Sequence, residues 1–146
     1  MTEDIKEEIR QAQSMQLATT VQEKPWIATV YFVADTNMNL YWLSYPNRRH
    51  SQEMAENPNV AVAIVMKADQ PVMGLQAVGT VEPVNDPELI QKIMPSYIQK
   101  YGQGSEFYER FIAGTAKHAM YKFMPTTFVL FDELHSPGDA RKELTL

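Results

Sequence analysis

The chain has 146 residues, of which 45% are hydrophobic and 21% charged, and its formal net charge at pH 7 is −5. This length and composition favour one globular domain over residues 1–146 and argue against disorder, while the excess of acids argues against nucleic acids and anionic membranes as partners. Because the chain has no cysteine, disulfides, thiolate metal sites and Cys nucleophiles are excluded.

The N-terminal residues predict a helix. Thr2 is a suitable N-cap, Glu3 and Asp4 follow in the first turn, and the helix should end near Ser14. This acidic start is unlike a secretory signal, and no stretch approaches the roughly 20 apolar residues of a membrane span. We therefore expect a cytoplasmic protein.

A β meander should follow the helix. Short segments rich in β-branched and aromatic residues predict strands at 16–21, 26–34 and 40–44. Turn-forming residues at 22–25 and 35–39 separate them. Aromatic side chains on strands usually pack inward, so we expect a mainly core position for five of them: Trp26, Tyr31, Phe32, Tyr41 and Trp42.

The middle of the chain alternates a helix with two long strands. A helix is predicted over 48–56, with Asn47 as its cap. The nearly continuous apolar run at 59–66 predicts a strand that is buried on both faces. The strand predicted at 72–84 contains two glycines, which indicate a bulge or a close approach of another backbone.

The C-terminal part begins with a helix and returns to strands. Asp86 and Pro87 are typical of a helix start, and this helix should reach Tyr101 with a kink or break at Pro95. The remaining predicted elements are a short helix at 105–113, strands at 118–123 and 126–132, and an extended polar tail at 133–146. Six or seven antiparallel strands with peripheral helices predict a mainly β, α+β barrel.

The most informative segment joins the strand at 40–44 to the helix at 48–56. The strand ends at Ser44, and Arg48, Arg49, His50 and Ser51 open the helix. Free N–H groups and the helix dipole attract anions at a helix start, and guanidinium groups strengthen such a site. A basic but solvated surface turn is an equally good interpretation of this spacing alone.

The order of these residues resembles the FMN-phosphate segment of the pyridoxamine 5′-phosphate oxidase-like family of split barrels. Leu43 and Ser44 match the family's strand end, Arg49 and His50 its basic pair, and Asn57-Pro58 the exit from its helix. The resemblance implies an antiparallel split β-barrel of six to seven strands. It also implies a homodimer that holds FMN at the subunit interface.

The resemblance assigns roles to ten residues. Arg49 and His50 would bind the phosphate with help from Arg48 and Ser51, and Ser44 with the backbone at Leu43 would contact ribityl or phosphate oxygens. The strand from Ala28 to Val33, including Val30, would face the flavin ring. Gln76 would bind near the pyrimidine edge, and Arg141 or Lys142 would reach in from the partner's tail.

Several positions depart from the family pattern. Ala28 and Val33 stand where true pyridoxamine phosphate oxidases carry an Arg and a substrate-binding Lys, and Gly74 stands where they carry a ring-contacting Gln. Gln76 lies two residues further on and on the same strand face. The C-terminal Arg-x-His-x-Arg signature is absent. These departures argue against pyridoxamine phosphate as the substrate.

Two functions remain open on the sequence. The first is an FMN-dependent oxidoreductase that transfers hydride through flavin N5 to or from a small substrate, with a reduced nicotinamide or another donor. The second is a non-catalytic flavin-binding module for sensing, storage or stress protection, with haem or a deazaflavin as a weaker variant. The three histidines are too scattered to predict a metal site, with His118 expected to be structural and His135 solvated.

Overall fold

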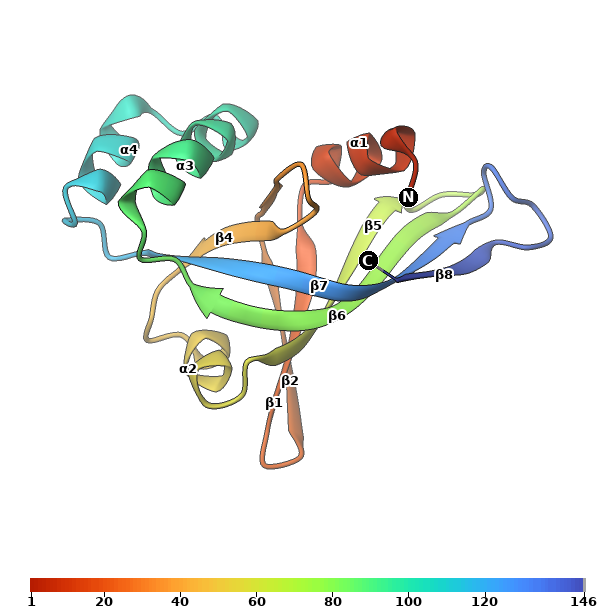
Figure 1. The fold of residues 1–146 in the computed structure, drawn as a ribbon, viewed down its shortest axis with the longest axis horizontal. Coiled ribbons are helices and arrows are strands. Elements are labelled where there is room, and N and C mark those ends of the chain that lie inside the picture. The colour runs from red at the N-terminus through yellow and green to blue at the C-terminus, as the bar shows by residue number, and fades with distance from the viewer. Residues whose placement is uncertain (146) are drawn as a thin grey trace.

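The fold is one curled antiparallel sheet with four helices around it, seen here in a computed structural model that describes residues 1–145 (Figure 1). The strands are β1 (Met15–Val21), β2 (Lys24–Val30), β3 (Val33–Ala34), β4 (Leu40–Ser44), β5 (Asn59–Lys67), β6 (Met73–Pro83), β7 (Ala119–Asp132) and β8 (Arg141–Thr145). The helices are α1 (Glu3–Gln11), α2 (Arg49–Glu56), α3 (Pro87–Tyr101) and α4 (Ser105–Ile112).

Seven strands form a half-barrel in the order β2-β1-β5-β6-β7-β4-β3, and β8 pairs with β7 outside this path. All of the pairings are antiparallel. The predicted α+β split-barrel class is therefore confirmed. The polar tail, expected to be extended, supplies β8 as the second strand of a hairpin with β7.

The strand predicted at 26–34 is broken between β2 and β3. Gln22 and Glu23 both have positive φ angles (52° and 62°), so the β1–β2 turn is tighter than predicted, and Pro25 already pairs with Thr20. At the other end of β2, Phe32 leaves the sheet and its side chain enters the core. Its backbone N–H donates to the Tyr101 hydroxyl (2.9 Å) instead of to a strand.

β5 is buried on one face only, contrary to the prediction for 59–66. Val60, Val62 and Ile64 point into the core, whereas Val65 is 57% exposed on the opposite side. The sequence is apolar on both faces, but nothing within residues 1–145 covers the second one. We call it the outer face; its residues are Gln16, Ala18, Ile27, Ala61, Ala63, Val65, Gln76, Val78, Thr127, Val129 and Phe131.

β7 is one long strand where two were predicted. Pro125 does not end it, because the register with β6 shifts there: Gly79 pairs with Pro125 and Val78 with Thr127. Thr126 is the extra residue, and its hydroxyl donates to the Val78 carbonyl (3.1 Å). The predicted break is thus a β-bulge, and Gly79 is the glycine that allows the close backbone approach.

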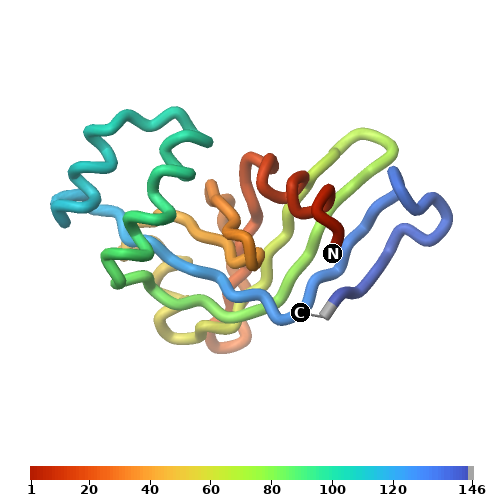
Figure 2. The backbone as a smooth tube through the Cα atoms, turned by 45° about the horizontal axis from the view of Figure 1, so that its top comes forward, coloured from red at the N-terminus to blue at the C-terminus, as the bar shows by residue number. Residues whose placement is uncertain are grey.

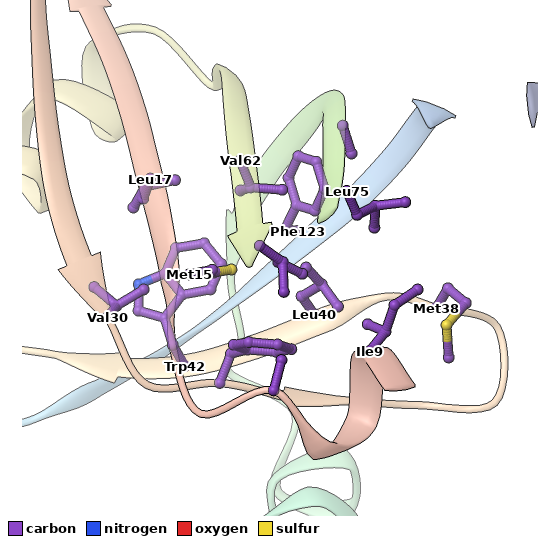
Figure 3. Packing of buried hydrophobic residues seen from close by; sticks show 14 of the residues in the cluster. Ile9, Met15, Leu17, Val30, Met38, Leu40, Trp42, Val62, Leu75 and Phe123 are labelled. Atoms are coloured by element: carbon purple, nitrogen blue, oxygen red, sulfur yellow. The ribbon is translucent and has the colours of Figure 1, made fainter. Parts of the chain in front are cut away.

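The core lies inside the curl of the sheet. Figure 3 shows side chains from β1, β4 and β7 meeting there, including Met15, Trp42 and Phe123, all with essentially no exposure. Phe32, Tyr41 and Trp42 are buried as predicted. The core prediction is wrong for Trp26 and Tyr31, which are 41% and 56% exposed.

α3 and α4 stand together at one end of the sheet, and the β7–β8 hairpin extends at the other (Figure 1 and Figure 2). Asp86 caps α3 by accepting from the Glu88 N–H (3.0 Å), and Gly102 ends it in the left-handed conformation. Pro95 lies inside α3 without ending it. Within residues 1–145, no helix has the length and apolar character needed to cross a membrane.

Candidate functional site

A cavity of about 490 Å³ opens where the ends of β2 and β4 meet the start of α2, below α3 and α4. Its volume lies in the range of small-ligand sites. The residues that line it are Thr29, Val30, Tyr31, Leu43, Ser44, Tyr45, Arg48, His50, Tyr97, Gln103, Phe107 and His118. None of these lining residues is acidic, although the whole chain carries 18 acids and 13 Lys plus Arg.

Ser44, Arg48 and His50 form the polar end of this cavity. The strand end fixes Ser44, which is buried, and its Oγ lies 2.8 Å from His50 Nε2. Arg48, not the predicted Asn47, is the N-cap of α2, and it makes no side-chain cap hydrogen bond. The first N–H groups of a helix have no intrahelical acceptor, so this end presents donors and positive charge together.

The environment of His50 favours the neutral form of its imidazole. Burial lowers the pKa of its imidazole, the nearby Arg48 guanidinium lowers that pKa further, and Glu53 opposes the shift. The hydrogen bond to Ser44 uses one ring nitrogen, and the tautomer decides which partner donates.

Arg49 and Ser51 lie beside the cavity and are not among its lining residues. The Arg49 guanidinium stacks 4.1 Å from the centre of the Trp26 ring, and its Nε lies 3.4 Å from the Glu53 carboxylate. Its side chain is half-exposed. Ser51 is buried, and within residues 1–145 its Oγ has no hydrogen-bond partner. An orphaned hydroxyl in the first turn of α2 is a polar atom that an added ligand could satisfy.

One wall of the cavity is the free edge of β2. This strand ends the sheet order, so within residues 1–145 no other strand pairs with its outer edge. Thr29, Val30 and Tyr31 line the cavity along it, so backbone donors and acceptors are available there. Val30 therefore lines the cavity, whereas Ala28 pairs with Leu17 and lies outside the lining.

The roof of the cavity comes from distant parts of the chain. Tyr97 of α3, Gln103 of the loop after it and Phe107 of α4 face the polar end from above. His118 joins them; its ring stacks on Tyr45 (4.2 Å between centroids) and meets Phe107 edge-on (5.7 Å). Burial lowers the pKa of His118, which favours its neutral form as well.

Hydrogen bonds and ring stacking hold α3, which forms part of the roof, at the break between β2 and β3. Tyr101 stacks on Tyr31 (4.7 Å), and its hydroxyl contacts both backbone groups of Phe32 and donates to the Gln13 carbonyl (2.9 Å). Lys100 Nζ donates to the Phe32 carbonyl (2.9 Å), and burial lowers the pKa of Lys100 to about 8. α3 is thereby fixed relative to the free edge of β2.

Gln76 and Arg141 lie on the outer side of the sheet, away from the cavity lining. Gln76 is exposed between Ala63 and Val129 on the outer face. Arg141 pairs with Phe131 at the β8 margin, where its guanidinium lies 3.9 Å from Glu143. A shallow groove of about 320 Å³ runs over this face, lined by apolar and amide side chains. Within one chain, neither Gln76 nor Arg141 lies at the polar end of the cavity.

Residues 1–145 contain no group of three or more His, Asp or Glu side chains placed to hold a metal ion. Five residues of the cavity lie outside both the ten predicted site residues and the predicted ring-facing strand: Tyr45, Tyr97, Gln103, Phe107 and His118. His118 lies beside the polar end because its neighbour Ala119 pairs with Ser44. This pairing forms only with the sheet, so the local sequence does not indicate it.

The chain is similar to known proteins both in sequence and in structure. Residues 1–128 match the family model described as pyridoxamine 5′-phosphate oxidase. Among solved structures, the conserved hypothetical protein Rv2991 from Mycobacterium tuberculosis has a TM-score of 0.77 at 15% identity, over 92% of this chain and 86% of that chain. Among curated proteins, none matches significantly.

Two further structures share the fold. A putative pyridoxamine 5′-phosphate oxidase from Listeria innocua has a TM-score of 0.67 at 19% identity, over 91% of this chain and 97% of that chain. HutZ, a haem storage protein from Vibrio cholerae, has a TM-score of 0.65 at 20% identity, over 84% and 87%. At such identities, these similarities establish the fold alone.

Proposed function

Since this chain belongs to the pyridoxamine 5′-phosphate oxidase-like family, we propose that its cavity binds FMN and that the protein is a flavin-dependent oxidoreductase acting on a small substrate. The observation that carries the proposal is the polar end of the cavity. Ser44, Arg48 and His50 converge there at a helix start, with no acid among the lining residues.

The donor set fits a phosphate monoester. A guanidinium, a hydroxyl, an imidazole and the first N–H groups of α2 offer charge-assisted hydrogen bonds to several oxygens. Arg49 would join if the phosphate drew its half-exposed guanidinium away from Glu53, and the unpaired Ser51 hydroxyl is available in the same turn. The backbone at Leu43 borders this end and suits the ribityl chain.

The rest of the cavity fits a flat ring. The free edge of β2 supplies backbone donors and acceptors at Thr29 to Tyr31, of the kind that a pyrimidine edge needs. Tyr31, Tyr97 and Phe107 supply aromatic surface. The departures at Ala28 and Val33 still argue against pyridoxamine phosphate, so the substrate is another small molecule that enters beside the ring.

The proposal also includes a homodimer, in which a second copy of this chain covers the outer face. Ile27, Val65 and Val78 are 61%, 57% and 51% exposed there, a pattern typical of an interface and unusual for a free surface. An uncharged face can meet its own copy about a two-fold axis without burying like charges, even in a protein of net charge −5. Gln76 and Arg141 would then approach the cavity of the other copy.

The bound flavin would supply hydride transfer at N5. The chain's own residues bind the phosphate, orient the ring along β2 and exclude water with the roof of α3 and α4. Tyr101 and Lys100 hold that roof in register with the β2 edge. None of these roles requires a side-chain nucleophile.

Anaerobic reduction tests the oxidoreductase function. FMN-loaded protein mixed with NADH or NADPH in the absence of oxygen is expected to lose its flavin absorbance at a catalytic rate, and to recover it when a small quinone or nitro compound is added. Protein that keeps its flavin colour with both donors would contradict an enzyme that uses nicotinamides.

A non-catalytic role is the second candidate, and two observations favour it. The chain lacks the family's substrate-binding Arg and Lys, and its fold is shared with the haem storage protein HutZ. His50 and His118 both face the cavity and could ligate a haem iron. A Soret band on addition of hemin, with no binding of FMN, would favour haem over flavin.

Arg48→Ala and Arg49→Ala are each expected to weaken FMN binding by about 1.5–3 kcal/mol, the range for hydrogen bonds to charged groups. Quenching of flavin fluorescence gives the dissociation constant, and Arg10→Ala on α1 serves as the distant control. Riboflavin, which has no phosphate, should bind both variants as it binds the parent. Unchanged FMN affinity in both variants would place the phosphate elsewhere.

A further inference from the structure

We propose that the phosphate end of FMN binds together with a proton that is taken up by His50, so that the protein retains its cofactor more tightly as the pH falls from about 8 to about 6. This inference rests on the proposed function, because it requires FMN in the cavity. It adds a regulation of that site: cofactor occupancy becomes a function of pH.

The geometry places the imidazole where the phosphate charge must sit. His50 Nε2 lies 2.8 Å from Ser44 Oγ, and both side chains line the same cavity end as Arg48. A neutral imidazole that shares its proton with a serine can donate only one ring N–H in total. A phosphate that displaces the serine contact would gain an N–H donor at Nε2 and a positive charge from a protonated ring.

The groups that face His50 allow this change of charge. Arg48 and Arg49 adjoin it in the chain, and Glu53 lies one turn further along α2. The other titratable groups that line the cavity are Tyr45 on the β4 side, Tyr31 at the end of β2, and Tyr97 and His118 on the roof. The Glu53 carboxylate is already engaged by Arg49 and by the Thr19 hydroxyl (3.0 Å).

The direction of the effect follows from linkage. Without ligand, burial and Arg48 hold the pKa of His50 below its usual value, so the neutral imidazole is favoured. A bound phosphate dianion favours the imidazolium and raises that pKa. Between the two pKa values, binding takes up as much as one proton, so the affinity rises by at most about tenfold for each pH unit of acidification.

The second ionisation of the phosphate sets the lower limit of the pH range over which the affinity rises. Its second pKa is about 6, so below that pH the ligand loses part of its charge and the gain in affinity ends. The expected profile is therefore a falling affinity from about pH 6 to about pH 8, steeper than the profile for a site built from Arg or Lys.

Isothermal titration calorimetry of FMN into the full chain tests the inference. At neutral pH, in buffers of different ionisation enthalpy, the observed heat should show uptake of a fraction of a proton for FMN and none for riboflavin. His50→Gln should abolish the uptake, and His50→Lys should bind FMN tightly without it. His135→Gln, a change in the exposed β7–β8 loop, should keep it.

Each other outcome counts against the inference. FMN binding without proton uptake in the parent protein overturns it and leaves the proposed function standing. Uptake that survives in His50→Gln, or that is lost in His118→Gln instead, assigns the proton to another group and also overturns it. No FMN binding at any pH overturns the proposed function as well.

Discussion

Val78→Asp is expected to convert the proposed dimer into a folded monomer. Val78 lies on the outer face between Ala61 and Thr127, and its side chain is 51% exposed in the single chain, so the fold itself tolerates a carboxylate there. In the interface, the same carboxylate is buried without a partner. Such a charge costs about 3 kcal/mol or more, which is more than about a hundredfold in the dimer dissociation constant.

Sedimentation equilibrium at micromolar concentration measures the effect. FMN affinity should fall with the loss of the dimer, because the second copy would no longer bring Gln76 and Arg141 near the cavity. Gln91→Asp, on the exposed side of α3, is the matched control and should remain dimeric. A parent protein that is monomeric, or a Val78→Asp variant that stays dimeric, would show that the outer face is not the interface.

Gly79→Ala is expected to destabilise the fold by about 3 kcal/mol or more. At the bulge opposite Pro125, a Cβ on residue 79 would lie 2.2 Å from the Met124 carbonyl oxygen and 2.8 Å from the Pro125 Cα. Both obstacles are backbone atoms of β7, so relief requires β6 and β7 to separate over the longest pairing of the sheet.

Gly74→Ala on the same strand is the control for this substitution. Its Cβ would meet only the Ile64 carbonyl oxygen, at 3.3 Å, and should cost within about 1 kcal/mol. Denaturant unfolding of both variants gives the comparison. Equal losses of stability would mean that the close approach of β7 at the bulge does not account for the effect at residue 79.

The polar end of the cavity was predictable because its parts are close in the sequence. Ser44 and His50 are six residues apart, and a strand end, a short turn and a helix start suffice to bring them together. The same local order could not predict the direction of Arg49, since its contact with Trp26 depends on the β1–β2 hairpin packing beside α2.

The roof depends on contacts between segments that lie far apart in the chain. His118 reaches the site because β7 pairs with β4 some 75 residues earlier in the chain, through Ser44 and Ala119. Tyr97 reaches it because α3 docks on the β2–β3 break, where Tyr101 bonds to the backbone of Phe32. Neither relation can be predicted from local sequence, because each joins segments that lie far apart in the chain.

The apolar run of β5 is a case in which the sequence prediction and the single chain differ. Its two apolar faces predicted burial on both sides, and the single chain buries only one. If the outer face is an interface, the second face is buried by the partner, and the sequence pattern reflects the assembly.

Titration of the purified protein with FMN, followed by flavin fluorescence and absorbance, tests the central claim most directly. The cavity predicts saturable binding of one FMN per chain, weaker binding of riboflavin, and a further loss for FMN in Arg48→Ala because the phosphate contact is removed. FMN that does not bind, or that binds no better than riboflavin and equally well to Arg48→Ala, would contradict a phosphate site at Ser44, Arg48 and His50.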